Sequence, residues 1–299
     1  MTVRPAHWVA LLCLVALWGS SYLMIEIALV TWKPAEIAAL RISAAAVVLL
    51  LAMLFRGDRL PSSWRHWGLF VAIALIGNCL PFFLISWGQQ HVESGLAGIL
   101  AASTPLFVLV LAHFSLDDER LAGRHVAAFG LGFCGIVALM GPDSLAAAGG
   151  SMERLLAQLA ILGGAVGYAV ATVIARKLPA GSAVVTSAGV MLVGSLFMSP
   201  YVGAGLSAPG PDWRGAAALG FLGVMGTGVA SILYFRLVAE TGARFTSMLN
   251  YLVPVWAVGL GAAVLGELLP WTAWLGLILV LGSLILVSKS AIIPSQIKK

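Results

Sequence analysis

Two stretches of this sequence share one pattern at a fixed distance along the chain. They are residues 100–118, LAASTPLFVLVLAHFSLDD, and residues 249–267, LNYLVPVWAVGLGAAVLGE. Each is an apolar run of helical length with one proline near its start. An acid follows thirteen positions later, which gives the pairs Pro105 with Asp118 and Pro254 with Glu267. A single offset of 149 residues superposes both pairs. The spacing therefore predicts an internal repeat by halves, a pattern typical of secondary transporters.

The composition indicates a membrane protein. Of the 299 residues, 61% are hydrophobic and 10% are charged, against roughly 45–50% and about 25% in soluble domains. A soluble protein needs more polar surface than this chain has, so we expect an all-α membrane protein with many spans. The net charge of +5 comes largely from basic residues in short loops between apolar runs. That placement indicates membrane topology and not a nucleic-acid interface.

At about 20 apolar residues per span, the sequence predicts ten transmembrane helices. Their expected ranges are 8–30, 36–55, 67–88, 95–115, 122–141, 155–175, 183–202, 215–237, 245–266 and 271–288. Residues 142–154, PDSLAAAGGSMER, form the longest weakly apolar link in the middle of the chain. We therefore expect a first five-helix repeat over residues 1–141, a linker over 142–154 and a second five-helix repeat over 155–299.

The loop charges predict the orientation of the helices. One side of the membrane would carry twelve basic residues: Arg4, Arg56, Arg59, Arg65, Arg120, Arg124, Arg176, Lys177, Arg244, Lys289, Lys298 and Lys299. The other side would carry three: Lys33, Arg154 and Arg214. Because basic loops stay in the cytoplasm, both termini should be cytoplasmic, in a cell inner membrane. With five spans in each half, the second repeat must then be inverted relative to the first.

Short motifs in both halves resemble the drug/metabolite transporter superfamily, and within it the ten-helix carriers of the EamA type. The motifs are Leu17-Trp18-Gly19-Ser20-Ser21, Ala39-Leu40-Arg41, Thr104-Pro105-Leu106, Ala175-Arg176-Lys177, Val253-Pro254-Val255 and Leu265-Gly266-Glu267. The resemblance implies two inverted five-helix repeats, and its nearest branch implies bacterial exporters of amino acids, including aromatic ones. The first half departs from the family pattern, because its Gly-Glu ending is replaced by Asp117-Asp118-Glu119.

The two prolines are candidates for helix kinks that take part in gating. Pro105 and Pro254 have no N–H to donate to the carbonyls of Ala101 and Asn250, so each helix should bend or loosen at mid-span. A freed carbonyl in a bilayer must face protein or water. We therefore expect both carbonyls to face a cavity, with a passive packing kink as the alternative.

Polar side chains in spans 3, 8 and 9 are candidates for substrate binding. Span 8 carries a stripe at helical spacing, made of Gly220, Gly223, Thr227, Ser231 and Tyr234. The offset of 149 maps Thr227 onto Asn78 in span 3. An amide at mid-depth is costly to leave unpaired, so Asn78 and Asn250 are the stronger candidates. The alternative for small and hydroxylic residues is helix packing alone.

Deep aromatic residues are candidates for the walls of a pocket. Most tryptophans lie at expected helix ends, where interfacial anchoring explains them. Trp18, Tyr168 and Tyr251 lie deeper, and Tyr22 shares a helix face with Trp18. We expect these four to line a pocket for apolar or aromatic side chains. Plain core or lipid contact is the alternative.

Few charges fall inside the expected spans. Glu26 in span 1 and Arg41 in span 2 lie toward the same side of the membrane. They either form a structural ion pair or leave Glu26 free to carry a proton. Arg236 lies close to the cytoplasmic end of span 8, where its side chain should reach the interface.

These patterns predict a secondary transporter, and the resemblance implies that it exports amino acids and related small metabolites by alternating access. A sparsely charged interior suits zwitterions or neutral solutes better than phosphates. We expect a monomer in the lipid bilayer that binds a small-molecule substrate, with no cofactor, no metal and no nucleic-acid partner. The cysteines Cys13, Cys79 and Cys134 are scattered through apolar runs, which argues against a disulfide framework or a metal site.

Two alternatives from other classes stay open. One is a proton-coupled exporter of drugs or organic cations that uses Glu26 as its exchange carboxylate. The other is an intramembrane enzyme or a scaffold that transports nothing. The sequence contains no Walker-type nucleotide loop and no nucleophile constellation, so we do not expect an enzyme.

The predicted topology can be tested with single cysteines in a cysteine-free background. Cysteines placed next to Arg59 and Lys298 should be protected from a membrane-impermeant thiol reagent in intact cells. A cysteine next to Asp212 should be labelled. Labelling next to Arg59 in sealed cells would overturn the orientation, and with it the inverted repeat.

Overall fold

A computed structural model describes residues 3–115, 123–145, 152–179, 181–206 and 213–288. Asp118, from the stretch that revealed the repeat, lies outside these ranges. In the described residues, helices occupy each of the ten expected spans. Six helical stretches are long and apolar enough to cross a membrane, and four shorter apolar helices account for the other spans. The chain is therefore an all-α membrane protein with ten spans in two inverted five-helix repeats.

The first repeat contains seven α-helices and one π-helical segment, written η. They are α1 (Pro5–Leu29), α2 (Pro34–Phe55), α3 (Trp64–Ala74), η1 (Leu75–Cys79), α4 (Leu80–Gly88), α5 (Ser94–Ala101), α6 (Thr104–Ser115) and α7 (Gly123–Leu145). Span 3 is the continuous stretch α3, η1 and α4, while span 4 is divided into α5 and α6. Pro34 opens α2, a position where its missing N–H costs nothing.

The second repeat has the same plan. Its elements are α8 (Met152–Ala175), α9 (Ala183–Phe197), α10 (Ser199–Leu206), α11 (Trp213–Gly220), η2 (Phe221–Val229), α12 (Ala230–Thr241), α13 (Ala243–Thr246), α14 (Leu249–Leu265) and α15 (Trp271–Ser288). Span 8 is α11, η2 and α12, so both repeats carry their π-helical segment in the third span. Gly266 ends α14 in the left-handed conformation, at a φ of 67°, where glycine is favoured.

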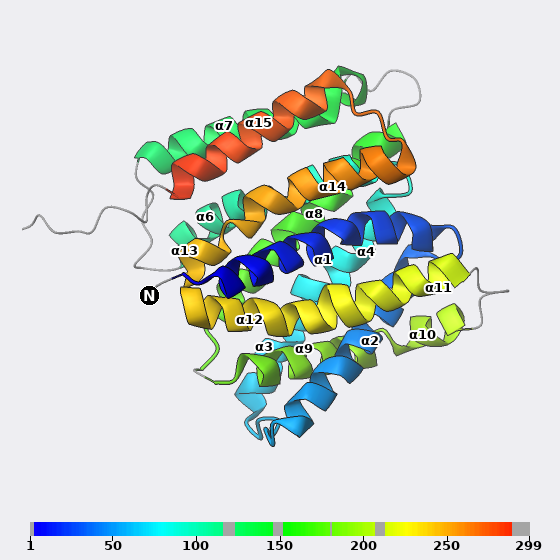
Figure 1. The fold of residues 1–299 in the computed structure, drawn as a ribbon, viewed down its shortest axis with the longest axis vertical. Coiled ribbons are helices and arrows are strands. Elements are labelled where there is room, and N and C mark those ends of the chain that lie inside the picture. The colour runs from blue at the N-terminus through cyan, green and yellow to red at the C-terminus, as the bar shows by residue number, and fades with distance from the viewer. Residues whose placement is uncertain (1–2, 116–122, 146–151, 180, 207–212, 289–299) are drawn as a thin grey trace, which may run out of the picture.

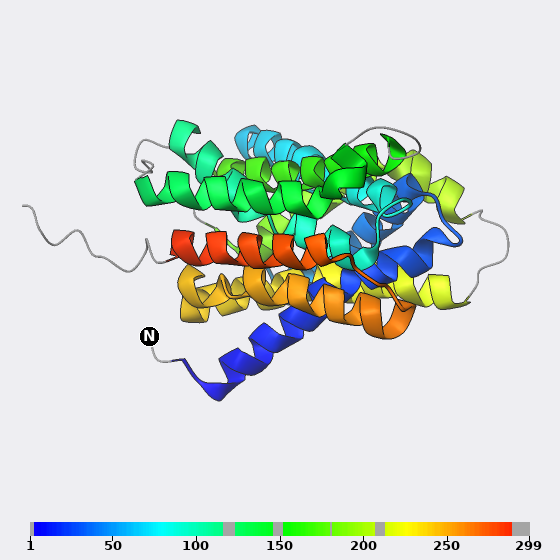
Figure 2. The ribbon, with the colours of Figure 1, turned by 90° about the horizontal axis from the view of Figure 1, so that it is seen from above.

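The helices of the two repeats alternate in space instead of forming two separate bundles. The neighbouring pairs include α1 with α14, α4 with α8, α2 with α9 and α7 with α15. In Figure 1, α7 and α15 lie side by side along one edge of the bundle, and α2 and α9 lie toward the opposite edge. Figure 2 shows the same helices turned by 90°. The helix α1 begins at one face of the membrane, which we call the near face. It ends at the opposite face, which we call the far face.

The break in span 4 precedes its proline. The helix stops at Ala101 and resumes at Thr104, so Pro105 occupies the first turn of α6, where proline is tolerated. The Thr104 hydroxyl donates to the carbonyl of Ala101 at 2.8 Å, and the Ser103 hydroxyl donates to that of Leu100 at 2.6 Å. The Ala101 carbonyl thus accepts a bond from a side chain of the same span, and its orientation toward a cavity stays a prediction.

Span 9 is interrupted farther from its proline. The short α13 ends at Thr246 and α14 begins at Leu249, whereas Pro254 lies buried inside α14. The interruption and the proline are thus separate features in this span. The cavity-facing carbonyl of Asn250 stays a prediction.

Candidate functional site

Arg41 in α2 is the most buried of the basic residues that the structure describes. It follows Pro34 by seven residues, which places its Cα about two turns below the far end of the helix. Only 8% of its surface is accessible. Its Nε donates to the Thr227 hydroxyl at 2.8 Å, and its guanidinium carbon lies 3.9 Å from the centre of the Phe82 ring. Arg41 thus joins span 2 to spans 3 and 8.

Two tyrosines complete the surroundings of this cation. Tyr22 in α1 and Tyr168 in α8 both lie within electrostatic range of Arg41. The ring of Tyr168 also meets that of Phe82 edge to face, at 6.3 Å between ring centres. Both tyrosines pack against core residues yet stay partly accessible. We call Tyr22, Arg41, Phe82, Tyr168 and Thr227 the Arg41 cluster, in which five different spans contribute one residue each.

The π-helical segments carry the same hydrogen bond in both repeats. In η1, the Asn78 amide donates to the carbonyl of Ile73 at 3.1 Å, and in η2, the Thr227 hydroxyl donates to that of Leu222 at 2.8 Å. The offset of 149 relates both the two donors and the two acceptors. A side chain thus satisfies the carbonyl five residues earlier, where the π-helical geometry interrupts the α-helical ladder.

A glycine precedes each of these donors and lets a helix of the other repeat approach. A Cβ at Gly77 would overlap the Cβ of Ala171 in α8, and a Cβ at Gly226 would lie 3.1 Å from the hydroxyl of Ser21 in α1. Both glycines therefore lie where the third span of one repeat packs against the first helix of the other repeat. The close approach explains why these positions carry no side chain.

The structure groups the other candidate residues separately. Trp18 and Tyr234 face each other on α1 and α12, at 5.2 Å between ring centres, and belong to a cluster closer to the near face. The hydroxyl of Tyr251 donates to the carbonyl of Leu284 in α15 at 2.7 Å. Asn250 is exposed. Of the eight expected substrate-binding residues, the Arg41 cluster contains Tyr22, Tyr168 and Thr227, while Asn78 occupies the matching position in η1.

The sequence did not single out Phe82. It is one of twelve phenylalanines in an apolar chain, and no spacing distinguishes it from the others. Arg41 was recognised as a charge within a span, although its partners were not.

The ion pair expected between Glu26 and Arg41 is wrong. Among the described residues, no acid lies within ion-pairing distance of Arg41, and Oε2 of Glu26 is buried without a hydrogen-bond partner. Glu26 lies three residues before the end of α1, whereas Arg41 lies seven residues into α2. The two positions therefore differ in depth by about 6 Å.

Glu26 belongs instead to a polar group near the far face. Gln89 lies beside it and donates to the carbonyl of Tyr22 at 2.8 Å. Nearby, both carboxylate oxygens of Glu267 accept backbone N–H groups at the start of α5, from Ser94 at 2.8 Å and from Gly95 at 2.9 Å. The acid of the second repeat motif thus ties the end of span 9 to the start of span 4.

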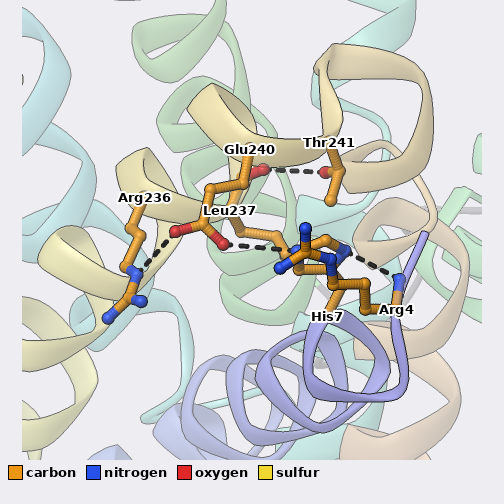
Figure 3. Close-up of polar contacts among 6 residues, drawn as sticks. All are labelled: Arg4, His7, Arg236, Leu237, Glu240 and Thr241. Atoms are coloured by element: carbon orange, nitrogen blue, oxygen red, sulfur yellow. Dashed lines mark hydrogen bonds and ion pairs between the residues drawn. The ribbon is translucent and has the colours of Figure 1, made fainter. Parts of the chain in front are cut away.

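The near face is tied together by a different set of charges. Glu240 in α12 accepts from Arg236 at 2.8 Å and contacts Nε2 of His7 in α1 at 3.3 Å, as Figure 3 shows. Arg236 is exposed at the end of its span, as expected for a side chain that reaches the interface. These contacts fix the start of α1 against the end of span 8, away from the Arg41 cluster.

Comparisons with known proteins agree with this architecture. A model of the EamA-like transporter family matches residues 6–141 and 155–289. The uncharacterized inner membrane transporter YedA of Escherichia coli strain K12 is 30% identical over 294 residues, covering 93% of this chain and 89% of the relative. A probable terminal-alkyne amino-acid exporter of Streptantibioticus cattleyicolor is 26% identical over 292 residues, covering 97% of this chain and 95% of the relative.

A solved crystal structure shares the fold. It matches with a TM-score of 0.65 at 24% identity and covers 97% of this chain and 98% of that chain. At this identity the likeness concerns the arrangement of helices alone.

The double role of Thr227 predicts a measurable loss of stability. Thr227→Val leaves two buried groups without their partner, Nε of Arg41 and the carbonyl of Leu222, and should destabilise the purified protein by about 1–3 kcal/mol. Thr227→Ser keeps the hydroxyl and should cost less. Thr172→Val is the matched control, because the Thr172 hydroxyl bonds the carbonyl of Tyr168 on an exposed helix surface. Equal melting temperatures for the two valine variants would contradict the assigned role.

Proposed function

The chain belongs to the EamA-like transporter family, and on that premise we propose that it is a secondary transporter that exports amino acids and related small metabolites. It would work by alternating access in the inner membrane, as a monomer, with both termini in the cytoplasm. The two repeats, residues 1–141 and 155–299, would be the units that change places around the substrate.

The observation that carries this proposal is the duplicated interruption in spans 3 and 8. Asn78 and Thr227 make matching bonds to carbonyls in two π-helical segments related by the repeat. Irregular helical segments at matching points of two inverted repeats point to a transporter's substrate site, and π-helical segments are frequent at functional sites. Thr227 also contacts Arg41, so one of these interruptions opens directly onto the polar and aromatic residues of the Arg41 cluster.

A difference between the two faces supports alternating access. At the far face, α5 packs closely on α14: a Cβ at Gly98 would lie 2.7 Å from the Cβ of Ala257, and one at Gly95 would lie 3.2 Å from Val258. Toward the near face, α6 packs on α8 and α7 instead. Spans 4 and 9 are thus held together at one end, as in a carrier that is closed at the far face and open at the near face.

The substrate class rests on chemistry and on one relative. The Arg41 cluster combines a cation, two phenolic hydroxyls and aromatic rings, which suits a small molecule with a carboxylate and an apolar side chain. The Streptantibioticus cattleyicolor relative is named as a probable exporter of an amino acid. Both features favour amino acids over phosphorylated metabolites, which would need several cations in the site.

A second candidate function follows from Glu26. Its Oε2 atom is buried without a partner among the described residues. An ionisable residue within a span is a candidate proton carrier. A proton-coupled exporter of drugs or organic cations would use such a group, so this alternative keeps one specific observation in its favour.

Counterflow in proteoliposomes tests the proposed function. Vesicles loaded with an unlabelled mixture of amino acids should accumulate external labelled L-phenylalanine, because the carrier exchanges one substrate for another. Empty liposomes provide the blank, and Glu26→Gln should retain this exchange.

The same vesicles test the alternative. Uptake of tetraphenylphosphonium driven by a pH gradient and lost in Glu26→Gln, with no exchange of any amino acid, would establish the cation exporter instead. Absence of flux for both classes of probe would contradict transport of either kind.

The closed far face gives a further prediction that concerns Glu267. Glu267→Gln removes the charge that strengthens the two N–H bonds to α5, so the far face should open more often. A single cysteine at Tyr22, in a cysteine-free background, should then react faster with an impermeant thiol reagent added outside intact cells.

Glu93→Gln is the matched control. Glu93 lies at the same face but pairs with Arg154 at 2.7 Å, a contact that does not involve span 9. Faster labelling in both variants would indicate a general loosening of the far face. An unchanged rate in Glu267→Gln would show that this carboxylate does not hold the gate closed.

A further inference from the structure

We propose that Arg41 binds the carboxylate of the transported substrate. The inference rests on the proposed function, and it names the chemical group by which that site recognises its substrate. A guanidinium stays protonated in proteins, and Arg41 is more than nine-tenths buried within a transmembrane bundle. Charged side chains at such depth face the interior of the bundle and mark the path of a substrate or an ion.

Among the described residues no carboxylate pairs with Arg41, and the nearest candidate by sequence, Glu26, is turned to the polar group at the far face. Thr227 and Phe82 supply a hydrogen bond and a ring face, but neither carries a charge. The site is therefore completed by an anion that comes from outside the described chain.

The donors that Arg41 can offer to such an anion are its two terminal amino groups. Among the described residues, Arg41 makes one hydrogen bond, from Nε to Thr227, which leaves the two terminal amino groups of the guanidinium as further donors. Neither is among the polar atoms that the packed core encloses without a partner. They therefore reach accessible space, where two parallel N–H groups can bind a carboxylate in a fork-to-fork arrangement.

Aromatic side chains form a wall beside these donors. Phe82 covers one face of the guanidinium, and Tyr168 extends the aromatic surface edge to face. Tyr22 and Tyr168 add two phenolic oxygens, which can accept hydrogen bonds from an ammonium group. A carboxylate on Arg41 thus leaves the amine of an amino acid near hydroxyls and its side chain near aromatic rings.

This arrangement predicts what the site selects. A single cation balances one carboxylate, so monocarboxylates should bind better than phosphates or dicarboxylates. An amine without a carboxylate would leave Arg41 uncompensated and add a second positive charge beside it. Organic cations should therefore be rejected. Thr227 acts here as a positioning residue, because it touches Arg41 and not the substrate.

A series of analogues on the wild-type protein is the first test. L-phenylalanine should inhibit counterflow of labelled L-phenylalanine about 100-fold better than phenethylamine or L-phenylalaninamide, because these two lack the carboxylate. This arm needs no variant, so a misfolded mutant cannot obscure it. Equal inhibition by all three compounds would overturn the role of Arg41 while leaving amino-acid transport standing.

Variants of Arg41 are the second test. Arg41→Gln should lose L-phenylalanine exchange and also the rise in melting temperature that L-phenylalanine gives the wild type. Arg41→Lys should recover part of both, because it restores the charge without the fork. Arg236→Gln is the control, since it removes an exposed arginine at the near face and should change neither readout.

The outcomes separate the two proposals. Exchange that survives in a folded Arg41→Gln variant, with its preference for the carboxylate intact, would refute the inference alone. Failure of the wild type to exchange any amino acid would refute the proposed function and the inference together. Where Arg41→Gln fails to fold, the wild-type analogue series decides.

Discussion

Every backbone polar group within a bilayer must find its partner inside the protein, since lipid offers none. Where spans 3, 4 and 8 depart from regular α-helix, a side chain of the same span donates a hydrogen bond to a backbone carbonyl. Ser103 and Thr104 do so at the break in span 4, and Asn78 and Thr227 do so in the two π-helical segments. The interruptions can therefore exist at membrane depth without unsatisfied carbonyls, and this makes a polar interior possible.

Thr227 links that backbone requirement to the chemistry of the site. Its hydroxyl proton is committed to the carbonyl of Leu222, so its oxygen is free to accept from Arg41. The π-helical segment thus fixes the orientation of the hydroxyl, and the hydroxyl holds the guanidinium. The counterpart in the first repeat, Asn78, makes the same backbone bond, but of these two side chains only Thr227 accepts from Arg41. Two repeats with equal backbones therefore support unequal roles.

The far face depends on close contact between small residues and one carboxylate. Gly95 and Gly98 let α5 approach α14, and Glu267 bonds the first N–H groups of α5. Such a contact has two discrete states, bonded or separated, and does not stretch gradually. Alternating access requires both states within a few kcal/mol of each other. A pair of charge-assisted hydrogen bonds is of the right size, about 1.5–3 kcal/mol each.

The sequence by itself determined the ten spans and the repeat. The length of an apolar run and a constant offset can both be recognised in the sequence without knowledge of helix packing. The same offset related Asn78 to Thr227 before their carbonyl partners were known. Glu267 was found in the same way, as the acid of a repeated motif.

Only the tertiary structure decided which residues meet. Arg41 contacts Thr227, 186 residues away, and not Glu26, because α1 and α2 place the two charges at different depths. Trp18 and Tyr22 lie on one helix yet belong to different clusters. The physical reason is that α1 is apolar on every side, so its hydrophobic pattern does not indicate which face turns inward. In a bilayer that choice is made by packing against neighbouring helices.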